Sequence, residues 1–129
     1  MKNQEIFNFV RSHLLGMKER CVDDFGDCIF YDNSTGASCA VGCLLPQLGL
    51  PYDDLKIAQN TNGGIGALRD NSGIEFPSWF QEALCPDGIL LHLQKLHDSP
   101  ENWNNDKAKM SLELEKIADL FDLTCESVI

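Results

Sequence analysis

The chain has 129 residues, of which 43% are hydrophobic, and its formal net charge is −10. This length fits one domain that buries about two-thirds of its unfolded surface, so we predict a single domain over the whole chain that needs no disulfide. The acidic balance excludes the Lys- and Arg-rich surface that direct binding to nucleic acid or to an anionic membrane requires, and it favours a basic partner protein.

The cysteines and the absence of an export signal predict the cellular compartment. We identify no signal peptide, and no apolar run approaches the ~18 residues of a membrane span. Cysteines without an export signal, in a chain with a full core, favour free thiols over a disulfide framework. We therefore expect a cytoplasmic protein with these thiols reduced: Cys21, Cys28, Cys39, Cys43, Cys85 and Cys125.

Apolar residues at helical spacing predict most of the secondary structure. The predicted helices span residues 3–19, 55–59, 76–84, 88–97 and 105–122. Asn3 is the predicted N-cap of the first helix, and Asn105 or Asp106 that of the last. The helix over residues 88–97 is apolar around most of its circumference, which predicts that it is central and buried.

A short β element is predicted before the central part of the chain. Residues 28–31, Cys-Ile-Phe-Tyr, form a β-prone run between two polar turn segments, and residues 37–39 are its candidate partner strand. The predicted fold class is therefore mainly α (α+β), a single compact helical domain with a small β-hairpin near residues 27–40.

Residues 37–46, Ala-Ser-Cys-Ala-Val-Gly-Cys-Leu-Leu-Pro, combine two cysteines with small and apolar residues. If Ser38 caps a helix, Cys39 falls in its first turn and Cys43 lies on the same face one turn later. Pro46 ends this helix. We expect the segment to pack against the helix over residues 88–97 in the core.

Cys39 is the candidate nucleophile, because a thiol near a helix N-terminus is surrounded by unpaired N–H groups that favour the thiolate. His97 is the candidate base, and Asp98, Asp87 or Asn102 could orient its imidazole. The competing interpretation is that both cysteines of the stretch are small buried apolar residues, as free cysteines often are.

No metal ion or cofactor is predicted. The Gly-x-Gly segment at residues 61–66 lacks the strand and the further residues that a phosphate loop requires. The candidate zinc ligands are numerous but lack Cys-x-x-Cys spacing. These ligands are Cys21, Cys28, Cys39, Cys43, His92 and His97.

Two tryptophans and two acids are the candidate residues of a partner-binding surface. Trp79 and Trp103 lie in polar sequence contexts, where each could serve as an exposed anchor or could cover an end of the core. Asp53 and Asp54 are the acids assigned to the same surface, where they would suit a basic partner.

Three segments resemble one family: residues 39–46, Cys-Ala-Val-Gly-Cys-Leu-Leu-Pro, residues 93–98, Leu-Gln-Lys-Leu-His-Asp, and Trp103. They are similar to segments of small uncharacterised proteins of tailed phages, prophages and some bacteria. The resemblance covers most of the chain, except the Gly-rich stretch at residues 61–75. It implies a mobile-element origin and an accessory function against host systems. It also implies that six residues belong together: Cys39, Gly42, Cys43, His97, Asp98 and Trp103.

Two functional hypotheses follow. The first is a viral (bacteriophage) or mobile-element accessory protein that acts in the host cytoplasm by binding a host or phage protein, for example as an acidic inhibitor of a host defence protein. The second is a cysteine-dependent hydrolase or transferase, with Cys39 as nucleophile, His97 as base and Asp98 orienting that base.

Overall fold

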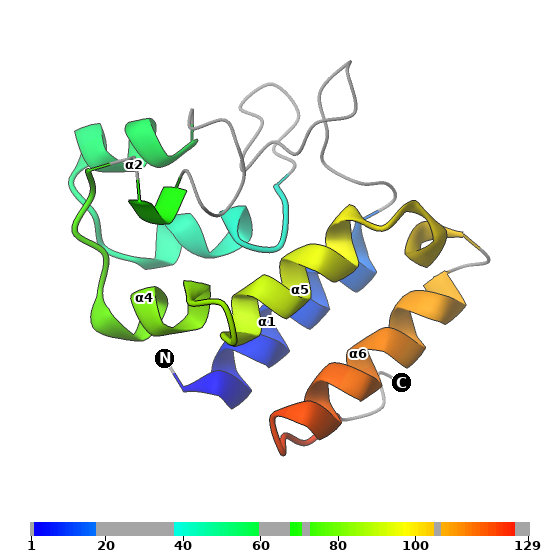
Figure 1. The fold of residues 1–129 in the computed structure, drawn as a ribbon. Coiled ribbons are helices and arrows are strands. Elements are labelled where there is room, and N and C mark those ends of the chain that lie inside the picture. Colours follow the sequence, from blue (N-terminus) through cyan, green and yellow to red (C-terminus); the bar gives the residue numbers. More distant parts are fainter. Residues whose placement is uncertain (1, 18–37, 60–67, 71–72, 105–106, 126–129) are drawn as a thin grey trace.

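The computed structural model describes residues 2–17, 38–59, 68–70, 73–104 and 107–125 (Figure 1). The regular elements in these ranges are α-helices and 3-10 helices (η), which confirms the mainly α class. They are α1 (Asn3–Gly16), η1 (Gly42–Gln47), α2 (Tyr52–Gln59), α4 (Ser78–Leu84), α5 (Ile89–Asp98), η2 (Pro100–Trp103) and α6 (Ala108–Leu120).

The β-hairpin predicted near residues 27–40 is not supported. Residues 27–37 lie outside the described ranges, and residues 38–40 form no strand. Cys39, Ala40 and Val41 are all completely buried, without the alternation of buried and exposed side chains that a half-exposed strand shows. The chain instead turns at once into η1.

Helix α5 is the centre of the fold, as its apolar circumference predicts. It contacts α1, α4, η2 and α6, and Figure 1 shows α1 behind it and α6 along its other side. Ile89, Leu90, Leu93 and Leu96 are all buried, and they cover more than one face of the helix. A helix that is apolar on several faces must have neighbours on each of them.

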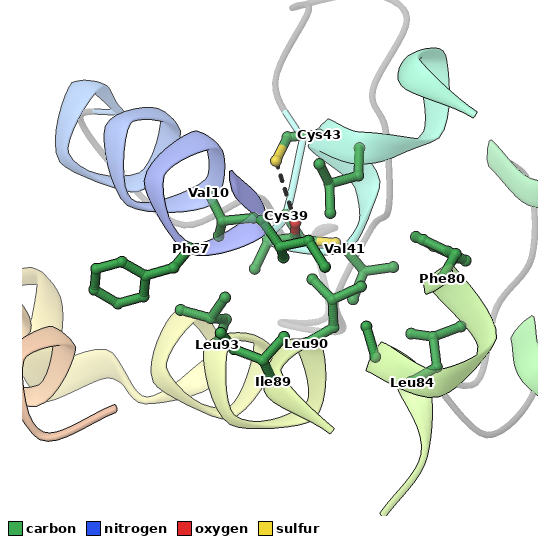
Figure 2. Close-up of a cluster of buried hydrophobic side chains, with 14 of the residues drawn as sticks. Phe7, Val10, Cys39, Val41, Cys43, Phe80, Leu84, Ile89, Leu90 and Leu93 are labelled. Carbon is green, nitrogen blue, oxygen red and sulfur yellow. Dashed lines mark hydrogen bonds between the residues drawn. The ribbon is translucent and has the colours of Figure 1, made fainter. Parts of the chain in front are cut away.

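The core forms where α1, α4, α5 and the segment before η1 meet (Figure 2). Helix α1 supplies Phe7, Val10 and Leu14, whose spacing of three and four residues places them on one stripe. All three are completely buried. Each contributes about 1.5–3 kcal/mol to the free energy of unfolding by removing apolar surface from water.

The N-caps of α1 and α6 differ from the predicted ones. Lys2, not Asn3, is the N-cap of α1. Lys107 is the N-cap of α6, in the left-handed conformation with φ of 63°. Asn105 and Asp106, the caps predicted from the sequence, lie outside the described residues.

The side chain of Lys107 joins α6 to the end of α1. Its Nζ donates to the carbonyl oxygen of Leu15 at 2.9 Å and also to that of Met17. A cation at the C-terminal carbonyls of a helix is favoured by the helix dipole. Partial burial lowers the pKa of Lys107.

Candidate functional site

The segment that carries Cys39 forms a tight turn followed by the 3-10 helix η1, so the helix capped by Ser38 that the sequence predicts is wrong. The N–H of Cys43 donates to the carbonyl of Cys39 at 3.0 Å. Pro46 lies inside η1, and in an α-helix its ring would meet the carbonyl four residues earlier. The tighter pairing of a 3-10 helix avoids that contact. The 3-10 helix begins at Gly42, so Cys39 precedes it.

The two cysteines of the turn make opposite hydrogen bonds. The N–H of Gly42 donates to Sγ of Cys39 at 3.3 Å, whereas Sγ of Cys43 donates to the carbonyl of Ala40 at 3.2 Å (Figure 2). Burial raises the pKa of the Cys43 thiol to about 12. Cys43 therefore stays protonated near neutral pH. The sulfur of Cys39 thus accepts a hydrogen bond from the turn, whereas the thiol of Cys43 donates one to it.

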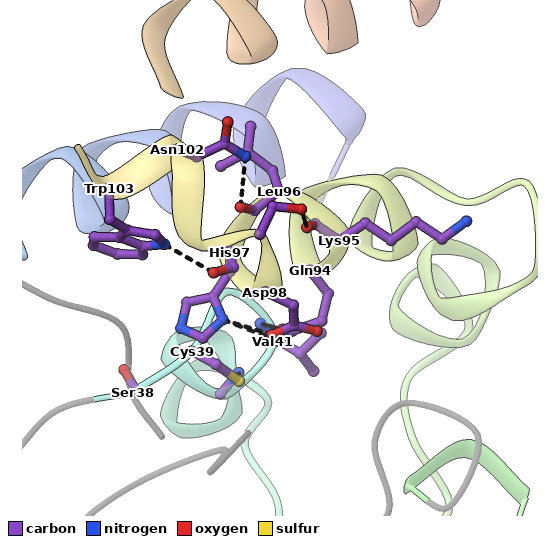
Figure 3. A network of polar contacts seen from close by, with 12 residues as sticks. Ser38, Cys39, Val41, Gln94, Lys95, Leu96, His97, Asp98, Asn102 and Trp103 are labelled. Carbon is purple, nitrogen blue, oxygen red and sulfur yellow. Dashed lines mark hydrogen bonds and ion pairs between the residues drawn. The ribbon is translucent and has the colours of Figure 1, made fainter. Parts of the chain in front are cut away.

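Gln94 connects this turn to α5. Its Oε1 accepts the N–H of Val41 at 3.0 Å, and its Nε2 donates to Oδ1 of Asp98 at 3.0 Å (Figure 3). The donor at Val41 and the acceptor at Asp98 together assign which end of the amide is oxygen. The predicted packing of the cysteine segment against α5 is confirmed by this buried link.

His97 and Asp98 form a hydrogen-bonded pair. Nδ1 of His97 lies 2.8 Å from Oδ1 of Asp98. Nε2 of Gln94 lies farther from the same nitrogen, at 3.4 Å. Because a carboxylate only accepts, the shorter contact favours the neutral tautomer with its proton on Nδ1, which leaves Nε2 as the basic nitrogen. Adjacent residues rarely point at each other on a helix. Here the pairing occurs at the last two residues of α5, where Asp98 ends the helix.

The segment after α5 holds His97 in place. Nε1 of Trp103 donates to the carbonyl of His97 at 2.8 Å, and the two rings meet edge to face with centroids 5.6 Å apart. Nδ2 of Asn102 donates to the carbonyl of Leu96 at 2.9 Å. Asn102 therefore caps the end of α5 and does not orient the imidazole. Trp103 covers the end of the core, which was one of the two roles considered for it.

Gln94 thus joins the cysteine turn, through Val41, to the His97–Asp98 pair. Cys39 and His97 are completely buried, and only the Asp98 side chain is exposed, at 46%. A thiol, an imidazole and a carboxylate are the groups of cysteine nucleophilic catalysis. The completely buried Cys39 side chain presents no exposed surface to a substrate in this structure.

A second histidine near the cysteine turn is not arranged as a base. Nε2 of His13 lies 2.7 Å from the carbonyl oxygen of Ser38 and must donate to it, since a carbonyl only accepts. The hydroxyl of Ser38 lies 3.2 Å from the same nitrogen. That nitrogen carries a proton and cannot take the proton of Ser38, so this pair joins α1 to the cysteine turn structurally.

The other predicted binding residues are not gathered in one place. Asp53 is exposed and Asp54 half-buried near the start of α2. Trp79 is half-buried on α4, with its ring against Phe80 at 5.6 Å between centroids. Figure 1 shows α2 and α6 on opposite sides of the molecule, so acids on these two helices form no continuous stripe.

A cavity of about 600 Å³ lies where α4, α5, the start of α1 and the end of α6 meet. Its walls combine aromatic and charged side chains, most of which the sequence did not single out. The lining residues are Lys2, Asn3, Trp79, Glu82, Ala83, Cys85, Asp87, Gly88, Ile89 and Phe121.

Gln94, which connects the cysteine turn to Asp98, is not among the residues predicted from the sequence. A signal was present, since a Gln in an otherwise apolar buried helix needs hydrogen-bond partners. Among the described residues, no group of three or more His, Cys, Asp and Glu side chains could hold a metal ion. None of the helices in the described ranges is long and apolar enough to cross a membrane.

The fold and the site define a small, mainly α-helical protein with a cysteine turn tied to a buried Gln-His-Asp network. Comparison with protein families, with curated proteins and with solved structures gives no match. A function must therefore be argued from the residues of this chain.

Proposed function

We propose that this protein is a phage or mobile-element accessory protein that acts by binding a basic protein partner. In its most specific form, the proposal is that the partner is a host defence protein and that binding inhibits it. The resemblance of its cysteine segment and its Leu-Gln-x-x-His-Asp segment to small phage proteins supports the origin. The charge distribution supports the mode of action.

The observation that carries the proposal is the surplus of exposed carboxylates without an ion-pair partner. Within the described residues, only Asp70, Asp98, Glu101 and Glu113 form ion pairs. These exposed acids take part in none of those pairs: Asp53, Glu75, Glu82, Asp87, Glu115, Asp119 and Asp122. Uncompensated surface charge attracts partners of opposite sign and accelerates their association, with a strong dependence on salt.

The test is to capture the partner with the tagged chain from bacterial lysate, to purify it and to measure its affinity by calorimetry. Replacing Asp53, Glu75, Glu115 and Asp119, which are all exposed and outside the ion pairs, by their amides should weaken binding and reduce its salt dependence. A control with Glu at positions 53 and 119 and Asp at positions 75 and 115 keeps the charge and should bind normally. Unchanged binding by the amide variant would contradict the proposal.

A cysteine-dependent hydrolase or transferase is the second candidate function, favoured by the 2.8 Å hydrogen bond between His97 and Asp98. In this mechanism Nε2 of His97 takes the thiol proton of Cys39, and the sulfur attacks a substrate carbonyl. The leaving group departs with the proton from His97, and water or another acceptor then releases the acyl group and restores the thiol. Asp98 holds the imidazole in the required tautomer.

Iodoacetamide labelling against pH, with mass spectrometry to assign each site, tests this second function. Fast labelling of Cys39 near pH 6 would support an activated thiolate that opens to solvent. Labelling only on unfolding would show that Cys39 is a core residue, as its complete burial favours. Cys85 is exposed and is the internal control for an accessible thiol.

A further inference from the structure

We propose that the cavity between Trp79 and Phe121 receives an arginine side chain of the partner protein. This inference rests on the proposed function, because it names the residue type through which a basic partner would be recognised. The inference also goes beyond the proposed function, because it assigns binding to one particular cavity and not to surface charge in general.

The walls of the cavity suit the flat face and the apolar stem of an arginine. Trp79 and Phe121 supply aromatic surface, and Ile89 and Ala83, both buried, supply the apolar part. A guanidinium group stacks on aromatic rings and is attracted by their electron-rich faces. The volume of about 600 Å³ leaves room for the backbone that carries such a side chain.

Each aromatic wall also contacts another ring that does not line the cavity. The Trp79 ring meets Phe80 edge to face at 5.6 Å between centroids, and Phe80 is completely buried. The Phe121 ring meets His92 in the same way at 5.4 Å. Walls that are fixed before binding reduce the conformational entropy that association costs.

Two carboxylates at the cavity supply the acceptors that a guanidinium needs. Glu82 lies in the last turn of α4 and Asp87 precedes α5, and both are exposed. Backbone hydrogen bonds fix the turn between them, from Cys85 N–H to Glu82 at 3.2 Å and from Gly88 N–H to Cys85 at 2.7 Å. The two acids are therefore presented by one rigid turn.

The charge at the cavity favours a cation over an anion. Lys2 is the one basic residue among the lining residues, against Glu82 and Asp87, and the whole chain has a net charge of −10. The N-terminus of α5 at Gly88 would favour an anion, but its partial charge of about +0.5 is smaller than that of either carboxylate. A cationic side chain with an apolar stem can therefore contact both the carboxylates and the apolar walls of the cavity.

The indole N–H signals of the ¹⁵N-labelled protein provide the readout. Trp79 lines the cavity, whereas Trp103 packs on His97 at the other end of α5, so the two signals report on separate places. A Trp79→Phe variant assigns them. Titration with a short peptide of alternating arginine and glycine should shift the Trp79 signal and leave the Trp103 signal in place.

Peptides of the same length with lysine or glutamate in place of arginine complete the comparison. We expect weaker binding of the lysine peptide, which cannot stack or form paired hydrogen bonds, and no binding of the glutamate peptide. Tight binding of the glutamate peptide at Trp79 would overturn the assignment and point to an anion site formed by Lys2 and the start of α5.

Matched charge variants separate this inference from the proposed function. Glu82→Gln with Asp87→Asn should weaken arginine-peptide binding about fivefold per carboxylate removed. Asp70→Asn with Glu101→Gln removes the same formal charge at two exposed acids that do not line the cavity, and it should change the affinity far less. Equal losses would mean that general acidity attracts the peptide and that the cavity assignment is wrong. No binding of the arginine peptide at low salt would instead count against a basic partner altogether.

Discussion

Oε1 of Gln94 accepts a hydrogen bond from the backbone N–H of Val41, 53 residues earlier in the chain, at 3.0 Å. This bond joins the cysteine turn to the central helix at a place that water does not reach. It also leaves the other end of the same amide to donate to Asp98. One side chain therefore determines the position of the turn relative to the His97–Asp98 pair.

Replacing Gln94 by Met should lower the free energy of unfolding by about 1–3 kcal/mol, because the buried N–H of Val41 loses its acceptor. Met has a similar length, so the loss of packing is small. Lys95→Met on the same helix is the control, since Lys95 is exposed and should change stability by about 0.5 kcal/mol or less. Urea unfolding followed by circular dichroism measures both; equal stability of the two variants would contradict the structural role.

Asp98 is expected to determine the tautomer of His97. In the native protein, two-dimensional ¹H–¹⁵N spectra of the imidazoles should show the proton of neutral His97 on Nδ1, because that nitrogen faces the carboxylate. Asp98→Ala removes the acceptor and should move the population toward the Nε2–H tautomer. His13 is the internal control, because it donates through Nε2 to Ser38 and should keep its tautomer in both proteins. An unchanged His97 spectrum in the variant would show that another contact fixes the ring.

Gly88 is required by the close approach of α4 and α5. A Cβ atom at this position would lie 2.2 Å from the carbonyl oxygen of Ala83. Because that oxygen belongs to the backbone, the end of α4 or the start of α5 would have to move to relieve the contact. Gly88→Ala should lower the free energy of unfolding by about 1–3 kcal/mol, the usual cost of overpacking. Gly16→Ala is the matched control, since nothing lies within 4 Å of a Cβ there. The control should be neutral or stabilised by up to about 1 kcal/mol because it occupies a helix. Thermal unfolding of both variants gives the comparison.

Much of the helical framework could be predicted because it follows from apolar periodicity alone. Leu93 and Leu96 lie on a helix with apolar residues on several faces, which predicts that other elements surround it. The structure places this helix, α5, at the centre of the fold. The stripe of α1 was equally clear from Val10 and Leu14. These side chains act through burial, which depends on spacing along the chain and requires no knowledge of distant residues.

Helix ends and the cysteine turn were predicted less well because they depend on distant contacts. Lys107 caps α6 while its ammonium group binds carbonyls at the end of α1, and no local pattern encodes that contact. Cys39 lies before its helix, which begins at Gly42 as a 3-10 helix that contains Pro46. Cys39, His97 and Asp98 were predicted from their chemistry as site residues, and that role stays a prediction. Gln94, which links Val41 to Asp98, was not predicted because its partners are distant in the chain.

The Cys43 thiol should make stability depend on pH above neutrality. Burial raises its pKa from 9.0 in an ordinary environment to about 12 in the folded protein. Between these values the unfolded chain has lost the thiol proton while the folded chain retains it. The unfolded state therefore binds fewer protons, and the free energy of unfolding falls as pH rises, by up to about 1.4 kcal/mol per pH unit. Below pH 9 this contribution is fully present.

Cys43→Ala isolates this contribution from the other groups that titrate in the same range. Urea unfolding of the native protein and the variant between pH 8 and about pH 11 gives two curves, and their difference belongs to Cys43. We expect the native curve to fall more steeply, because the variant has no thiol to deprotonate on unfolding. Parallel curves would mean that the folded protein releases the Cys43 proton as readily as the unfolded chain. In that case Cys43 would compete with Cys39 as the reactive sulfur of the turn, and the opposite hydrogen bonds of the two cysteines would no longer distinguish them.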